Sequence, residues 1–215
     1  MTKQFIIPAV TLLICSLCNW HQSLQAQSQP VARESLKTEF RDKELKNNQN
    51  LDERRRQVAA IIAAFSRYTE PDRARRLAHL CYDKTLDTIF MPMDLAEIAL
   101  TETAGHGLSG KAVSGKGAVG VWQLMPFRAK SHGFSPEEMQ NDEKCADAAV
   151  RELSSKLLMA RGSMARAKKL YCGVGPDADL YEARRRQFRR EIMREMDNIE
   201  PKRAEIVEKD IAQSS

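Results

Sequence analysis

The sequence predicts an all-α fold. Aromatic residues make up only 6% of the 215 residues, and the alternation of apolar and polar residues that indicates a half-buried strand is scarce. Alanine, leucine, glutamate, lysine and arginine dominate instead, and all five are strong helix formers. Composition and the missing strand pattern therefore agree on a domain built from helices.

Residues 1–26 are typical of a secretory signal peptide. Lys3 precedes an apolar run from Phe5 to Cys18, and the small residue Ala26 suits a cleavage site. The apolar run is too short to span a membrane comfortably. We therefore expect cleavage after Ala26 and a periplasmic or secreted protein in an oxidising compartment, with an uncleaved anchor as the alternative.

Residues 27–57 form a charged lead-in. Between residues 31 and 56, eight lysines and arginines accompany six acidic residues, and the polar run 47–50 lies among them. Such a segment has too little apolar surface to fold alone, so we expect it to be partly helical or disordered.

Two helices should open the domain, which we place at residues 58–199 with a tail at 200–215. In the first, apolar residues repeat at helical spacing before Pro71 breaks the pattern. The second begins at Asp72. Their buried faces comprise Val58, Ile61, Ile62 and Phe65, and Ala74, Leu77, Ala78 and Cys81.

A third helix is predicted over residues 92–103, because proline suits its first position and the glycine at 105 suits its stop. Glu102 lies seven residues after Leu95 and four after Ile98, and so on the apolar face. Burial and the negative end of the helix dipole both disfavour a charged carboxylate. Glu102 should therefore have a raised pKa and suit a general acid; the alternative is a glutamate at a fraying helix end that turns to water.

A glycine-rich loop follows this helix. Six of the ten glycines of the chain lie between residues 105 and 120. Glycine allows another backbone or a ligand to approach closely. Beside a buried acid, such a loop predicts the floor of a cleft.

Residues 112–126, AVSGKGAVGVWQLMP, resemble the signature of soluble-type lytic transglycosylases, a lysozyme-like family related to goose-type lysozyme. In that family a helix ends in Glu-Ser, and Ala-x-Ser-x-x-Gly-Ala-x-Gly-Leu-Met-Gln-x-Met-Pro follows. Glu102 and Thr103 would match Glu-Ser. The chain departs from the family at an insert around residues 105–109, which should change the cleft wall, and at Trp122, a bulky replacement for methionine expected close to the sugar site.

A second resemblance lies at residues 170–175, in the place of the family's Ala-Tyr-Asn-Ala-Gly turn. Tyr171 fits this turn, whereas Cys172 replaces the asparagine. A tyrosine hydroxyl can hold a buried carboxyl in position while its ring packs against apolar neighbours.

The resemblance implies a lysozyme-like helical domain with the glycine-rich loop at its active site, and an enzyme acting on peptidoglycan glycan strands. Glu102 would protonate the β-1,4 bond between N-acetylmuramic acid and N-acetylglucosamine. As a carboxylate it would then remove the proton of the muramic acid C6 hydroxyl, which gives a 1,6-anhydro sugar without water. The residues that match substrate-binding positions are Ser114, Gln123, Met125 and Tyr171, and no cofactor or metal is implied.

Three helical features are expected after the loop. Ser135 should cap one helix, and another should begin at Asn141. Residues 182–199 should form a basic amphipathic helix that Pro201 ends. Its six arginines suit a solvated face or attraction to acidic cell-wall polymers. For an exported protein we therefore expect association with the cell wall or the envelope machinery, and not with nucleic acid.

Three cysteines remain after cleavage: Cys81, Cys145 and Cys172. At most one internal disulfide is then available, and Cys145 with Cys172 is the preferred pair because it would brace the turn at Tyr171. A Cys-His hydrolase using Cys172 and His132 has no recognisable orienting partner.

Two alternative functions stay open. A lysozyme-like muramidase would also use Glu102, with a second carboxylate to activate water; Glu138, Asp142 and Glu143 are the candidates. The other is a catalytically inactive glycan-binding or assembly protein of the same fold, a possibility raised by the insert and by the departures at Thr103, Trp122 and Cys172.

Overall fold

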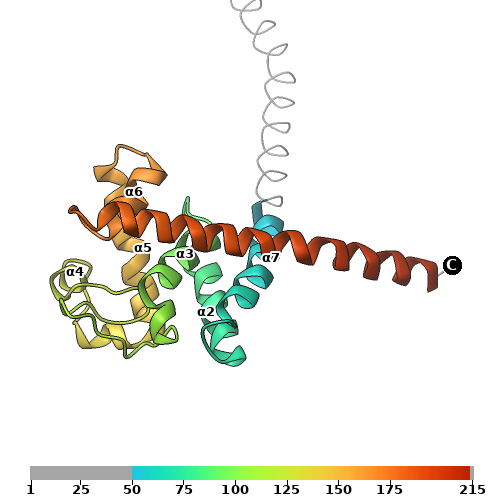
Figure 1. The fold of residues 1–215 in the computed structure, drawn as a ribbon, viewed down its shortest axis with the longest axis horizontal. Helices are drawn as coiled ribbons and strands as arrows, with labels where there is room; N and C mark the ends of the chain where they lie inside the picture. Colours follow the sequence, from blue (N-terminus) through green and yellow to red (C-terminus); the bar gives the residue numbers. More distant parts are fainter. Residues whose placement is uncertain (1–49, 214–215) are drawn as a thin grey trace, which may run out of the picture. The chain divides into compact units, whose positions relative to one another are not determined.

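The structure is a computed structural model that describes residues 50–213 (Figure 1). Over that range every regular element is a helix, and two isolated bridges pair Val113 with Val119 and Val119 with Leu124. The all-α prediction is therefore confirmed there. The predicted signal peptide and most of the charged lead-in lie outside the described residues. None of the described helices is both long and apolar enough to cross a membrane.

The first described helix runs from residue 50 to residue 65, so residues 50–57 of the expected lead-in are helical. Two polar side chains of this part are buried. Arg54 donates to the carbonyl oxygens of Thr85 (2.9 Å) and Thr88 (3.2 Å). Gln57 accepts a hydrogen bond from the backbone N–H of Met93 at 3.0 Å. The segment packs by satisfying backbone groups rather than by apolar contact, which composition alone could not indicate.

The two central helices form where the sequence predicts them. α2 spans Pro71–Asp83 and α3 spans Pro92–Thr103, each with proline in its first turn. Every residue of α3 is buried except Glu102. α3 is therefore the central helix of the domain, and it reaches solvent only at its predicted acid.

Two 3-10 helices and three α-helices follow α3 before the last helix. They are η1 (Ala104–His106), α4 (Pro126–Ser131), η2 (Glu137–Gln140), α5 (Asp142–Met159) and α6 (Met164–Tyr171). Ser135 precedes only the single 3-10 turn η2, where its N–H donates to the Glu138 carboxylate at 2.7 Å. Asn141 caps α5, because its side-chain oxygen accepts from the Lys144 N–H at 3.0 Å.

The last helix, α7, spans Ala178–Gln213 and lies along α3 and α6 (Figure 1). The prediction that Pro201 ends it is wrong, because the helix continues for a further twelve residues. A proline within a helix removes one backbone hydrogen bond. Here Lys202, Arg203 and Ala204 follow it directly, and their high helix propensity favours continuation.

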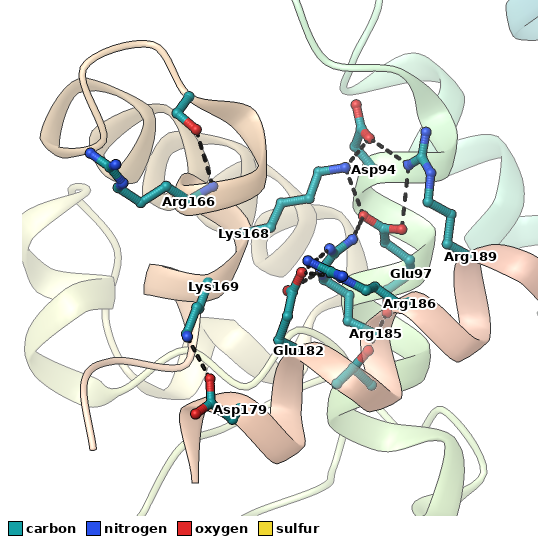
Figure 2. Close-up of polar contacts among 12 residues, drawn as sticks. Asp94, Glu97, Arg166, Lys168, Lys169, Asp179, Glu182, Arg185, Arg186 and Arg189 are labelled. Carbon is teal, nitrogen blue, oxygen red and sulfur yellow. Dashed lines mark hydrogen bonds and ion pairs between the residues drawn. The ribbon is translucent and has the colours of Figure 1, made fainter. Parts of the chain in front are cut away.

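Buried ion pairs hold α6 and α7 on α3 (Figure 2). Glu97 of α3 is fully buried and contacts Lys168 of α6 at 2.7 Å and Arg185 of α7 at 2.5 Å. Asp94, one turn earlier, pairs with the same lysine and with Arg189 at 3.1 Å. Buried charges are tolerated only when they are paired in this way. The network therefore fixes α6 and α7 against the helix that carries Glu102.

Candidate active site

Glu102 opens into a cavity of about 180 Å³ beside the C-terminal end of α3. Every residue predicted to act in catalysis or substrate binding lines it: Glu102, Ser114, Gln123, Met125 and Tyr171. The remaining lining residues are Lys116, Ala118, Leu124, Arg128, Glu152 and Cys172. The structure thus brings together side chains from α3, the glycine-rich loop, α4, α5 and α6.

The Glu102 carboxyl has the electrostatics of an acid that is protonated near neutral pH. Burial raises its pKa to about 7. The Tyr181 hydroxyl and the positive charges of Arg128 and Arg184 act in the opposite direction, but they do not outweigh burial. A group with this pKa can give up a proton and take one back at physiological pH.

The glycine-rich loop closes tightly under the cavity. Gly120 adopts a φ of 85°, and a Cβ atom there would lie 2.1 Å from the backbone oxygen of Met139. Only glycine fits such an approach. Gln123, with a φ of 50°, donates from Nε2 to the carbonyl oxygens of Gly120 (2.7 Å) and Ala112 (3.2 Å). This anchoring fixes the Gln123 side chain, and the strained backbone is typical of functional loops.

Two expectations about the cleft wall are wrong. Trp122 is fully buried, does not line the cavity, and donates its indole N–H to the Leu95 carbonyl oxygen at 3.0 Å. Its size fills the core rather than the sugar site. The insert at residues 105–109 does not line the cavity either, and the carbonyl oxygen of its Leu108 accepts a hydrogen bond from Arg73 of α2 at 2.7 Å.

Thr103 retains the hydroxyl of the serine that it replaces. This hydroxyl is buried and donates to the carbonyl oxygen of Val121 at 2.8 Å. The carbonyl oxygen of Ala99 lies 3.1 Å from the same hydroxyl oxygen. The hydroxyl therefore ties the loop to the end of α3 next to Glu102. A serine at this position would carry the same hydroxyl, so the replacement keeps a donor here.

Two tyrosines lie at the acid, and only one was predicted. Tyr171 lines the cavity, but its hydroxyl donates to the Trp122 carbonyl oxygen at 3.0 Å rather than to the carboxyl. The hydroxyl close to Glu102 is that of Tyr181 at the start of α7, which lowers the pKa of the carboxyl. Among residues 50–213 the buried Tyr181 hydroxyl has no hydrogen-bond partner of ordinary geometry. No sequence pattern distinguished Tyr181 from other residues of a charged helix.

The second carboxylate of the cavity is Glu152 of α5, which sequence reasoning missed. The candidates Glu138, Asp142 and Glu143 do not line the cavity and pair instead with Lys144, Arg73 and Lys84, respectively. A signal was available, since Glu152 lies three residues after Ala149 on the buried face of its helix.

Both oxygens of Glu152 are engaged. Its Oε2 lies 2.8 Å from Nε2 of His132, and its Oε1 contacts Lys156 at 3.1 Å and the Arg128 guanidinium. The side chain of Glu152 is 5% exposed. These three contacts involve both oxygens, as in an anchored structural anion rather than a base held free to activate water.

The described cysteines are all free thiols, so the preferred disulfide between Cys145 and Cys172 is not formed. Cys145 is buried in the core, and burial raises the pKa of its thiol to about 12. Cys172 is exposed at the cavity wall and contacts the Lys169 carbonyl oxygen at 3.3 Å. His132 contacts Glu152 rather than Cys172, which argues against a Cys-His pair.

Residues 87–186 match the family model described as the transglycosylase SLT domain. All cavity residues lie within this range. Comparisons with curated proteins and with solved structures found no match. No three His, Cys, Asp or Glu side chains in the part of the chain that the structure describes are grouped so as to hold a metal ion.

Proposed function

Since the chain contains a transglycosylase SLT domain, which belongs to the lysozyme-like lytic transglycosylase family, we propose that it is an exported peptidoglycan lytic transglycosylase. It cleaves the β-1,4 bond between N-acetylmuramic acid and N-acetylglucosamine and leaves a 1,6-anhydro muramic acid end. One observation carries this proposal above the others: Glu102 is the single residue of a buried helix that opens into the cavity.

The first step needs a proton on the glycosidic oxygen. With a pKa of about 7, the Glu102 carboxyl is protonated in about half of the molecules at neutral pH. It transfers this proton as the bond to the muramic acid C1 breaks, and an oxocarbenium-like centre develops on the sugar. The Glu102 carboxylate left behind is stabilised by the Tyr181 hydroxyl and by Arg128 and Arg184, which all favour the charged form.

The second step needs a base rather than a water. The Glu102 carboxylate removes the proton of the muramic acid C6 hydroxyl, and that oxygen bonds to C1. The proton returns to Glu102, so the enzyme is regenerated and no water is consumed. One carboxyl with a pKa near the working pH is suited to both transfers.

The state of Glu152 argues against the muramidase alternative. A hydrolase with two carboxylates needs a second one that is free to activate water or attack the sugar. Glu152 instead contacts Arg128, His132 and Lys156. The inactive alternative is weakened by the retained acid and by Thr103, whose hydroxyl still ties the loop to the catalytic helix.

Substrate contacts and location complete the proposal. Ser114, Gln123, Met125 and Tyr171 hold the sugars, as their place around the cavity supports. Residues 1–26 direct export, and the exposed arginines of α7 attract the protein to acidic cell-wall polymers.

Mass spectrometry of the products released from purified peptidoglycan tests the proposal. Wild type and Glu102→Gln are compared, because glutamine keeps the size of the side chain and removes the acid. Anhydro products from wild type alone are expected. Products with reducing ends would make the protein a muramidase, and no products from wild type would favour the glycan-binding alternative.

A further inference from the structure

The α4 wall of the cavity carries a cation that gives and takes no proton in the proposed steps and acts on Glu102 only through its charge. Arg128 lines the cavity, and its side chain is 18% exposed, so a ligand can reach it. Within residues 50–213 only Nη1 of its guanidinium has an acceptor, the Glu152 carboxylate. The N–H groups on Nε and Nη2 have no acceptor there. They form the two-pronged donor set that matches a carboxylate.

Buried contacts hold this guanidinium in place. The Glu152 side chain is 5% exposed, and it is itself fixed by Lys156 and by His132. The guanidinium carbon of Arg128 also lies over the exposed Phe127 ring, 5.5 Å from the ring centroid. A donor fixed in this way loses little conformational freedom when it binds a ligand.

The charge of the cavity favours an anion when the acid is ready to act. Two cations, Lys116 and Arg128, and two carboxyl groups, Glu102 and Glu152, line the wall. Lys156 adds a third positive charge in contact with Glu152. Once Glu102 carries its proton, one carboxylate faces three cations, and the wall is net positive.

We propose that Arg128, held by Glu152, binds a carboxylate of the glycan substrate beside Glu102, so that the enzyme prefers strands with free carboxylates. This inference rests on the proposed function. The carboxylate comes from either of two sources, the peptide stem or the lactyl group of a muramic acid that has lost its stem. Both present the same planar anion to the guanidinium.

The test measures kcat/KM on four soluble glycan substrates. Two are strands with intact stems, untreated or with their carboxylates converted to amides. Two are strands stripped of their stems by an amidase, again untreated or amidated. For wild type, amidation of the strand that supplies the carboxylate should lower kcat/KM roughly tenfold, the effect of about 1.4 kcal/mol of binding energy. The pair of strands that shows the loss identifies the source.

Arg128→Gln should abolish this discrimination, so that its ratio of rates on untreated and amidated strands falls to about one. Lys130→Gln is the matched control, because it removes the same charge two residues further along α4, outside the cavity wall, and should keep the wild-type ratio. If Arg128→Gln folds poorly, the double variant Arg128→Gln/Glu152→Gln removes both members of the ion pair and serves the same comparison.

The outcomes separate the two claims. Anhydro products with no preference for either untreated strand, or a preference that survives in Arg128→Gln, would overturn the carboxylate site and leave the proposed function standing. No product from wild type on any of the four substrates would overturn the proposed function itself. Equal losses of rate for Arg128→Gln on all four substrates would show a structural role only and overturn the inference.

Discussion

Replacing Tyr181 with phenylalanine should move the pH dependence of the enzyme. The Tyr181 hydroxyl lowers the pKa of Glu102, so its removal should raise that pKa above its present value of about 7. A hydrogen bond to a charged group contributes about 1.5–3 kcal/mol when its geometry is good. This hydroxyl has no bond of ordinary geometry, so we take the lower end. Losing about 1.4 kcal/mol of stabilisation of the charged carboxylate raises the pKa of Glu102 by about one.

The sign follows from the role of Glu102 as an acid. Activity requires its protonated form, so kcat/KM is present at low pH and falls as the pH rises through the pKa of about 7. At pH 8 about 10% of wild-type carboxyls carry the proton, whereas about half would do so with a pKa one unit higher. Relative to its own maximum, Tyr181→Phe should thus be about fivefold more active than wild type at pH 8.

The assay is the pH profile of kcat/KM on soluble glycan strands, read together with an NMR titration of the labelled Glu102 carboxyl. Tyr171→Phe is the matched control. Its hydroxyl donates to the Trp122 carbonyl oxygen rather than to the acid, so it should lower stability and leave the inflection where it is. An unchanged inflection in Tyr181→Phe, or the same shift in both variants, would refute the reasoning.

Three further predictions concern stability and are read from chemical or thermal unfolding. Gly120→Ala should prevent folding, because its Cβ would lie 2.1 Å from a backbone oxygen, whereas Gly115→Ala meets nothing within 4 Å and should be tolerated. Glu97→Gln should lower the free energy of unfolding by about 3–5 kcal/mol, because Lys168 and Arg185 would stay buried without this carboxylate. Asp72→Asn breaks only an exposed ion pair and should lower it little. Glu102→Gln should remove a pH dependence of stability. In wild type the pKa of Glu102 is about 7 in the folded state against 4.5 in the unfolded chain, so the free energy of unfolding falls by about 3 kcal/mol as the pH rises through that range.

The sequence predicted those features that depend on neighbours along the chain. Proline at 92 and glycine at 105 bounded α3 correctly, and helical spacing put Glu102 on the face that meets the core. The family signature identified residues that the structure places around one cavity, although their roles in binding are still predictions. These are local signals, since each one lies within a single helix or loop.

The features that were missed depend on contacts between distant segments. Trp122 was expected near the sugar because it replaces the methionine of the family signature, but its indole N–H donates to the Leu95 carbonyl oxygen, twenty-seven residues away. Tyr181 reaches Glu102 only because α7 packs along α3. From the sequence, Arg54 was one of many charges in a polar segment. In the structure it is buried, because its guanidinium donates to the carbonyl oxygens of Thr85 and Thr88. No spacing along the chain encodes such partners.

The carboxylates of α3 show how one helix can hold a structural anion and an acid. Burial acts to raise the pKa of both Asp94 and Glu102, but only Glu102 ends above its ordinary value. At Asp94 the Lys168 ammonium, the Met91 N–H and Arg189 outweigh burial, and its pKa falls below its ordinary value.

At Glu102, two turns further along, burial prevails, because α7 offers it the neutral Tyr181 hydroxyl while Arg128 and Arg184 act only through their charge. α7 thus supplies a cation to the first carboxylate and a neutral donor to the second. A cation in ion-pair contact with Glu102 would lower its pKa and remove the proton that the reaction needs. The neutral residue at position 181 therefore helps to keep the pKa of Glu102 where the acid can carry its proton.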